Sequence, residues 1–230
     1  GQKFPLTIKR LGINGEGVGF YKRNVVFVKG AIPGEEVTVK LTKVSPKFAE
    51  AEILTIRKAS EFRQEAPCSV YAECGGCQLQ HMTYEAQLIN KRDIVVQAFE
   101  KFAKEIGETT EIRQTLGMED PWNYRNKSQF QVRKDGKRVY AGLFSEGSHQ
   151  LLNINDCLVQ QPLTTKITVA VRKILQKLNI TIYDGKSLNG LVRTIVVRTG
   201  LKTGETQVCL VTTRNELPHK AELIERIKKI

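Results

Sequence analysis

The stretch Val26-Phe-Val-Lys-Gly-Ala-Ile-Pro-Gly-Glu35 sets the fold of the first part of the chain. Its apolar, β-branched run is followed by Pro33 and Gly34 in the order of a type II turn, where proline fixes φ and glycine then supplies a positive φ. Comparable runs bounded by glycine or proline lie on both sides, at Leu6–Leu11, Val37–Val44 and Ala51–Ile56. This spacing predicts a small antiparallel β-barrel over residues 1–58.

Four glycines, Gly12, Gly15, Gly17 and Gly19, lie between the first two runs of the barrel. Glycine can supply positive φ at turns, and we expect these four to do so. A phosphate-binding loop is the alternative interpretation. Such a loop continues into Gly-Lys-Ser/Thr and opens a helix, and neither feature follows here.

Helix and strand patterns alternate after residue 58. A helix is expected from about Thr83 with a stop at Gly107, and a hairpin is expected around Asp135-Gly136, between strands 128–133 and 139–144. Further along we expect a helix over 163–178, a second hairpin over 191–199 and 206–213, and a helix over 216–230. The predicted fold class is α+β, with an OB-like barrel over 1–58 and an α+β domain over 59–230.

The chain is basic in two lobes. Lys and Arg number 36 against 24 Asp and Glu, which gives a net charge of +12. Residues 1–58 carry a net +6 and residues 121–230 a net +11, whereas residues 59–120 carry −5. This distribution favours a polyanionic partner such as RNA, DNA or an anionic membrane surface, although a solvated lysine-rich face is the alternative for either lobe. Apolar runs are too short for a bilayer span, so we expect no membrane insertion.

The two ends of the sequence suggest a shortened chain. It begins Gly1-Gln2-Lys3 without a methionine or a signal peptide, and it ends in a Lys- and Ile-rich segment. We therefore expect truncation at both ends. Five cysteines, an odd number, without a secretory signal indicate a reducing compartment, and we expect a cytoplasmic location.

Cysteine spacing is the strongest chemical signal in the sequence. Cys68-x5-Cys74-x2-Cys77 forms a compact group, and Cys157 follows 80 residues after Cys77. Structural zinc sites usually use two short pairs, whereas three cysteines plus a distant fourth is typical of iron–sulfur ligation. The glycines at positions 75 and 76 allow the backbone to wrap tightly and to direct N–H groups at the sulfurs. We expect an iron–sulfur site, with a zinc site or a chance cluster of buried cysteines as the alternatives.

Three other residues with ligand chemistry are expected to be structural. Cys209 lies in a strand-like run without a partner cysteine, which favours a small buried hydrophobic residue. His81 and His149 could bind a metal, but four thiolates already suffice. We expect both histidines to be hydrogen-bonded parts of the fold.

The cysteine region resembles that of a known family. The segment from Cys68 to Leu88, CSVYAECGGCQLQHMTYEAQL, is similar to the iron–sulfur signature of bacterial RNA (uracil-C5-)-methyltransferases of the RumA/RlmD/RlmCD type. Residues 1–58 are similar to the TRAM domain that opens those enzymes, an OB-like barrel that binds RNA. Trp122–Lys127, Gly147–His149 and Ile154–Cys157 resemble motifs of the central domain, so the resemblance covers essentially the whole chain.

The resemblance implies a 4Fe-4S cluster held by Cys68, Cys74, Cys77 and Cys157 in a cluster-bearing central domain. It also implies the making of 5-methyluridine in 23S rRNA, by thiolate addition to the uracil, methyl transfer from S-adenosylmethionine to C5 and loss of the C5 proton. Motifs of the Rossmann-like methyltransferase domain are missing: there is no Asp-Pro-Pro, and Cys209 lacks a Ser-Cys-Asn-Pro setting. We therefore expect this chain to be the RNA-recognition half of an enzyme and to be inactive alone. We expect it to contain no catalytic or cofactor-binding residues, and S-adenosylmethionine to be used only by the intact parent.

An enzyme that modifies a base must extract it from the stack, which requires basic and aromatic side chains to hold the flanking strand. One group of candidates lies on or beside the first barrel turns, where OB-like folds expose their binding loops: Lys9, Arg10, Lys22 and Arg23. The second group could combine a stacking platform with phosphate contacts: Trp122, Arg125 and Lys127. A solvated rim and core packing of the tryptophan are the respective alternatives.

Two other functions compete with this interpretation. The first is a pure RNA-binding module, in which a zinc or cluster site staples the fold without methyltransferase activity. The second is a fragment of a radical S-adenosylmethionine methylthiotransferase, which would use Cys-x3-Cys-x2-Cys with an open iron site. The x5 spacing and the fourth cysteine argue for a closed cluster. In each case the expected partner is RNA, with 23S rRNA favoured, no membrane, and a monomeric chain.

Overall fold

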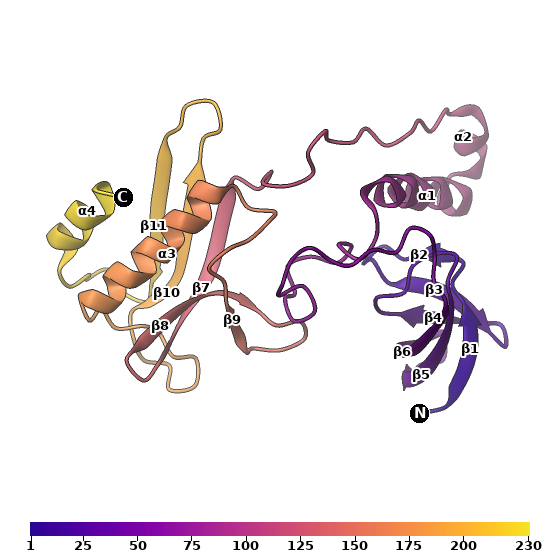
Figure 1. Cartoon of the computed structure of the whole chain (residues 1–230), viewed down its shortest axis with the longest axis horizontal. Helices are drawn as coiled ribbons and strands as arrows, with labels where there is room; N and C mark the ends of the chain where they lie inside the picture. The colour runs from indigo at the N-terminus through magenta and orange to yellow at the C-terminus, as the bar shows by residue number, and fades with distance from the viewer. The chain divides into compact units, whose positions relative to one another are not determined.

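The computed structural model describes residues 1–230, which form two units, each built from two separate stretches of the chain (Figure 1). The barrel unit consists of residues 1–69 and 77–119, and the sheet unit consists of residues 70–76 and 120–230. The units therefore divide differently from the expected boundary at residue 58. Residues 77–119 belong with the barrel, and the short segment 70–76 belongs with the second unit.

Six strands form the barrel: β1 (Lys3–Thr7), β2 (Arg10–Leu11), β3 (Gly17–Tyr21), β4 (Asn24–Val28), β5 (Glu36–Val44) and β6 (Phe48–Lys58). The strand order is β1-β5-β6-β4-β3-β2. Because β1 and β2 are consecutive in the chain yet lie at opposite ends of this order, the sheet closes on itself. All pairs are antiparallel, as expected, except the parallel pair of β4 and β6.

Glycines serve two different purposes in the barrel. Gly34 has a φ of 87°, and the backbone N–H of Glu35 donates to the carbonyl of Ile32, as expected for the Pro33-Gly34 turn. Of the four glycines between the first runs, Gly15 has the positive φ that was expected, at 88°. Gly17 lies in β3, where a Cβ would come within 2.8 Å of Ala31. Close packing across the barrel, and not turn geometry, excludes a side chain there.

Two helices complete the barrel unit: α1 (Tyr84–Phe102) and α2 (Lys104–Thr109). The helix begins where the sequence predicts, because the Thr83 side chain accepts the N–H of Ala86 as an N-cap. It packs on the barrel in a small cluster of apolar residues formed by Leu11, Ile32, Met82 and Ala86. Several of the larger apolar residues of α1 are exposed, among them Val95 at 44% and Phe102 at 78%.

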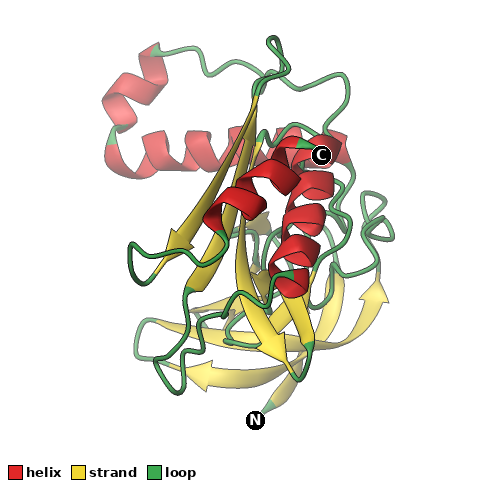
Figure 2. Ribbon diagram, turned by 90° about the vertical axis from the view of Figure 1, so that its left-hand side faces the viewer, coloured by secondary structure: helices red, strands yellow, loops and turns green.

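The sheet unit contains five antiparallel strands: β7 (Lys127–Asp135), β8 (Arg138–Phe144), β9 (Leu151–Asn153), β10 (Val192–Thr199) and β11 (Thr206–Thr212). Their order is β11-β10-β7-β8-β9. The helices α3 (Pro162–Lys177) and α4 (Lys220–Lys228) lie on the same side of this sheet (Figure 2). The expected hairpin is present, with Gly136 at a φ of 54° between β7 and β8.

One hydrophobic core holds the sheet unit together. It includes Phe130 and Val132 of β7, Ile195 and Val197 of β10, and Leu175 of α3, all fully buried. Alternate residues of each strand point to this core, so the remaining residues point to the other side of the sheet. None of the helices is long and apolar enough to cross a bilayer.

Candidate functional site

The hairpin turn between β3 and β4 presents two cations in a strained conformation. Tyr21 and Asn24 are partners in the register, so Lys22 and Arg23 form a two-residue turn. Their φ values are 48° and 70°, a left-handed region that is unfavourable for residues other than glycine and asparagine. Both side chains are exposed. The ring of Tyr21 stacks on Phe4 at 3.9 Å between centroids and anchors the base of the turn.

The other two barrel candidates lie at the step from β1 to β2. The backbone N–H of Lys9 donates to the carbonyl of Val18, and the Lys9 side chain is exposed. Arg10 is exposed but donates to the side chain of Gln97 on α1. The hydrogen bond to Gln97 therefore holds the Arg10 side chain against α1, whereas no such bond holds the side chain of Lys9.

A buried ion pair, which the sequence analysis did not identify, ties the end of the barrel to its Pro-Gly turn. Glu35 is fully buried, and both of its carboxylate oxygens accept from Arg63, one of them at 2.8 Å. Arg63 also donates to the carbonyl of Gly30, and the N–H of Ile32 donates to Glu35. Burial raises the pKa of Glu35, but these hydrogen bonds outweigh it and hold the pKa below its ordinary value.

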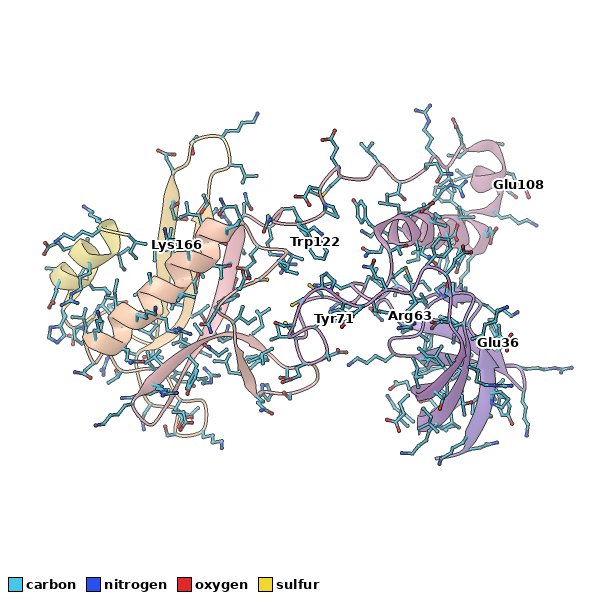
Figure 3. All side chains as sticks on the ribbon, in the orientation of Figure 1. Glu36, Arg63, Tyr71, Glu108, Trp122 and Lys166 are labelled. Carbon is cyan, nitrogen blue, oxygen red and sulfur yellow. The ribbon has the colours of Figure 1, made fainter.

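The tryptophan motif forms an extended segment that precedes β7. The N–H groups of Asn123 and Arg125 donate to the carbonyls of Leu158 and Val159, so the motif lies along the loop that follows Cys157. Arg125 is half-buried, and Lys127 is exposed at the start of β7. Trp122 is half-buried and is not part of the core of the sheet unit (Figure 3).

Cys74 and Cys157 are the two expected ligands that belong to the sheet unit, and both pack against its core. The N–H of Gly76 donates to the sulfur of Cys74 at 3.4 Å, as the glycine pair predicts. A Cβ at Gly76 would lie 2.9 Å from the terminal methyl of Leu143, so a side chain there would require Leu143 to shift. Such an N–H to sulfur bond stabilises a thiolate.

Cys68 and Cys77 belong to the barrel unit, and both are half-buried. All five cysteines are free of disulfide bonds. The donor chemistry suits a thiolate-ligated metal, but the structure contains no group of three or more His, Cys, Asp or Glu side chains that could hold one. The structure therefore does not support the expected four-cysteine centre.

Cys209 is not a buried core residue, which corrects the sequence-based expectation. It is exposed, and it lies opposite Val196 in the pairing of β10 and β11. The alternation of β11 directs Val208 and Leu210 to the core, so the residue between them points to the other side of the sheet.

The two histidines differ in their surroundings. His81 is buried, and burial, together with the nearby charge of Arg63, lowers its pKa from the ordinary value. His149 is exposed and lies edge-on to Phe144, with 5.7 Å between ring centroids. Neither lies in a metal-binding group.

Comparison with known proteins gives a domain match and a set of close relatives. Residues 1–54 match the family model of the TRAM domain, in agreement with the barrel. The chain is 58% identical over 229 residues to a Bacillus anthracis protein named "Uncharacterized RNA methyltransferase". A Listeria monocytogenes protein of the same designation is also 58% identical, over 99% of this chain. The alignments cover 50% of each relative, so the chain spans about half of their length.

A solved structure also resembles the chain. The tRNA (uracil-54, C5)-methyltransferase of Pyrococcus abyssi, in complex with S-adenosyl-L-homocysteine, aligns with a TM-score of 0.65 and 22% identity. The alignment covers 95% of this chain and 48% of that one. At this identity the likeness concerns the fold alone.

This structural match corrects the expected fold class. The expectation placed a cluster-bearing domain after the barrel and assigned the methyltransferase fold to a domain that the chain lacks. Instead, 95% of the chain aligns with the fold of a methyltransferase structure. The error arose because missing sequence motifs say little about the fold that the residues present adopt.

Proposed function

We propose that this chain is part of an S-adenosylmethionine-dependent RNA (uracil-C5-)-methyltransferase that forms 5-methyluridine in 23S rRNA. The observation that carries the proposal is the 58% identity, over the full length of the chain, to proteins named as RNA methyltransferases. The TRAM match over residues 1–54 and the uracil-C5-methyltransferase fold agree with it. The net charge of +12 favours an RNA partner on electrostatic grounds.

The proposed activity can be tested by following the C5 proton. Methyl transfer to C5 must release that proton, so RNA labelled with tritium at uridine C5 should release tritiated water when S-adenosylmethionine is present. The assay is made with the chain and with a protein of the relatives' full length, on 23S rRNA and on tRNA. Release from 23S rRNA alone supports the proposal. Release from tRNA alone contradicts the rRNA assignment, and none from either RNA contradicts uracil-C5 chemistry.

The turn between β3 and β4 is the proposed RNA contact of the first unit, together with Lys9 and Arg10 at the step from β1 to β2. Lys22 and Arg23 stand exposed at the tip of a hairpin and form no ion pair, so their charges are available to phosphates. Changing both to Gln should weaken RNA binding roughly tenfold at physiological salt, because two phosphate contacts are lost. Lys101→Gln with Lys104→Gln, on exposed residues of the same unit, is the matched control. Equal affinities of the two double variants would exclude the turn as a contact.

In the second unit, the proposed RNA contacts are Trp122, Arg125 and Lys127, before and at the start of β7. Trp122→Leu keeps the apolar bulk but removes the large ring, so it should weaken RNA binding if a base stacks there. Arg125→Gln should weaken binding and also lower its salt dependence. Fluorescence anisotropy with labelled RNA measures both. A tryptophan variant that melts early but binds normally would indicate a packing role instead.

The four cysteines Cys68, Cys74, Cys77 and Cys157 are proposed as ligands of a 4Fe-4S cluster. The support is the chemistry of thiol donors and the Gly76 N–H bond to the sulfur of Cys74. Iron, zinc and acid-labile sulfide are measured per chain on protein purified without oxygen. Iron with sulfide supports the cluster, whereas zinc without sulfide identifies a zinc-stapled RNA-binding module. If the protein contains neither iron nor zinc, the proposal that the cysteines are metal ligands is wrong.

A further inference from the structure

The sheet of the second unit has one face that no helix of that unit covers. We call it the open face. The helices lie on one side of the sheet (Figure 2). Phe130 and Ile195 point to the core on that side, so the alternate residues of each strand point to the open face. In β7 and its neighbours these are mostly polar: Lys127, Gln129, Gln131, Arg133, Arg198 and Gln207.

Two cations on the open face are direct neighbours. Lys127 of β7 and Arg198 of β10 are partners in the antiparallel register, and both are exposed. Directly opposed like charges destabilise a sheet. The residue opposite Arg198 on its other side is Gln207, and neither cation forms an ion pair. The arrangement is therefore unfavourable until an anion lies between the two side chains.

An aromatic ring lies on the same face. Gln131 pairs with Gly142, so Phe144, two residues further along β8, shares the open face. The guanidinium of Arg133 lies 5.4 Å from the ring centroid of Phe144 and is held along the sheet. Gly142 has no side chain between them. A ring and a guanidinium plane on a sheet surface form a platform on which an unpaired base can stack.

The composition of the open face favours nucleic acid over protein. The core of a protein interface is depleted in charged residues and rich in large apolar ones. Here the polar residues dominate, and the one acidic residue of β7, Asp135, stands at the far end opposite Arg138. Glutamine amides can donate to and accept from base edges, whereas the cations suit phosphates.

We propose that the open face binds a stretch of single-stranded RNA, with Lys127 and Arg198 holding a phosphate and Phe144 stacking with a base. This inference rests on the proposed RNA function. It adds a surface on the second unit to the barrel turn of the first. Lys127 is thereby assigned a partner in Arg198, which the sequence motif did not include.

The charge pair is tested with Lys127→Gln combined with Arg198→Gln. Its control is Lys173→Gln combined with Lys177→Gln, on exposed residues of α3 on the covered side of the same sheet. Binding of a fluorescein-labelled single-stranded RNA is measured by anisotropy across a salt series. The test variant should bind roughly tenfold more weakly, with the log–log salt slope smaller by about 0.7 because one phosphate contact is lost, and the control should match the parent. The test variant should fold normally, since it removes a repulsion.

Stacking is tested with Phe144→Leu, which keeps an apolar side chain at the site. Affinity should fall roughly tenfold while the salt slope stays unchanged, because no phosphate contact is lost. A circular-dichroism melt of this variant identifies simple unfolding. A well-folded Phe144→Leu protein with parental affinity would exclude the base-stacking part of the proposal.

Cys209 supplies an independent footprint, because its thiol lies exposed on the open face. The rate of its alkylation by N-ethylmaleimide, read peptide by peptide by mass spectrometry, should fall when RNA is bound. Unchanged alkylation with saturating RNA would overturn the proposal. So would a Cys209 that is already unreactive, before RNA is added, in a protein of the relatives' full length, because protein would then cover the face.

The possible outcomes separate this inference from the proposed function. If the parent chain binds RNA in a salt-dependent manner and the open-face variants bind equally well, the inference fails and the proposed function stands. If the parent chain binds no RNA at any salt concentration, both fail.

Discussion

The two units differ in what they bury. The barrel unit closes a six-stranded sheet around a core of ten buried residues and adds a fully buried carboxylate that is neutralised by Arg63. The sheet unit has a core of sixteen buried residues and satisfies its buried polar groups with hydroxyl pairs such as Ser128 and Thr168, 3.0 Å apart. The smaller apolar core of the barrel is thus accompanied by one buried charged contact, whereas the buried polar groups of the larger core are neutral.

This difference has a functional side. In the barrel the strands enclose the core, and the candidate cations Lys22 and Arg23 lie at a turn between two strands. In the sheet unit the helices and the core lie on one side, which leaves a whole face for ligands. The barrel unit thus offers RNA a small contact at a turn, whereas the sheet unit offers it an extended surface.

The largest effect is expected from Phe130→Ala, which should destabilise the sheet unit by about 3–5 kcal/mol. Phe130 is fully buried on a central strand, so the substitution leaves a cavity. Hydrogen exchange followed by mass spectrometry should show lost protection in β10 and β11 but not in β4 and β5. Phe102→Ala, at a side chain that is 78% exposed, is the control and should change little. Equal losses in both units would contradict the independence of their cores.

Arg63→Met should have a comparable effect on the other unit, about 3 kcal/mol, because it leaves the Glu35 carboxylate buried without its cation. Protection should be lost in β4 and β5 and retained in β10. Adding Glu35→Gln should recover part of the loss, since the unpaired charge is then gone. Arg57→Met, at an exposed position on β6, serves as the control. No recovery in the double variant would argue that Arg63 acts through packing.

A smaller effect is expected from acid. The pKa of Glu35 is lower in the folded chain than its ordinary value of 4.5, so the ionised form stabilises the fold. This stabilisation is complete above the unfolded-state pKa and is lost as the pH falls through the folded-state pKa. Urea unfolding, followed by hydrogen exchange in β4 and β5 between pH 7 and pH 3, measures the loss. Glu35→Gln should flatten the profile of these strands. An unchanged profile would assign the acid sensitivity to other groups.

The smallest effects concern the two hairpin turns. Lys22→Asn with Arg23→Gly should stabilise the barrel unit by about 1 kcal/mol, because these residues tolerate the left-handed region. Gly136→Ala, in the turn of the sheet unit, should destabilise it by about 1 kcal/mol for the same reason. The midpoint of urea unfolding should rise for the Lys22→Asn, Arg23→Gly variant and fall for Gly136→Ala. The turn variant should at the same time bind RNA more weakly, and a gain in both properties would refute a binding role for the two cations.

The sequence predicts most of the elements, because they rest on local signals. The Pro33-Gly34 turn, the Thr83 cap and the Asp135-Gly136 hairpin each have a short-range cause, and each is present. The exposed position of Cys209 could have been found from the alternation of β11, since both of its neighbours are apolar.

The remaining features depend on long-range contacts. The partner of Glu35 lies 28 residues away, in a segment without a regular pattern, so no local signal identifies Arg63. Lys127 and Arg198 are neighbours because of the order of strands in the sheet, which a single sequence does not define. On α1, the small residue Ala86 makes the contact with the barrel, and no local signal distinguishes it from the larger apolar residues of the helix.

The path of the chain through its two units has a consequence for dissecting them. The backbone passes from one unit to the other three times, after residues 69, 76 and 119. A single protease cut at any one crossing gives two fragments, neither of which corresponds to one complete unit alone. A gene fragment ending at residue 69 or 76 lacks α1 of the barrel unit. The seven residues 70–76, which include Cys74, Gly75 and Gly76, belong to the sheet unit and connect two stretches of the barrel unit. Their deletion would remove part of one unit while shortening the connection within the other.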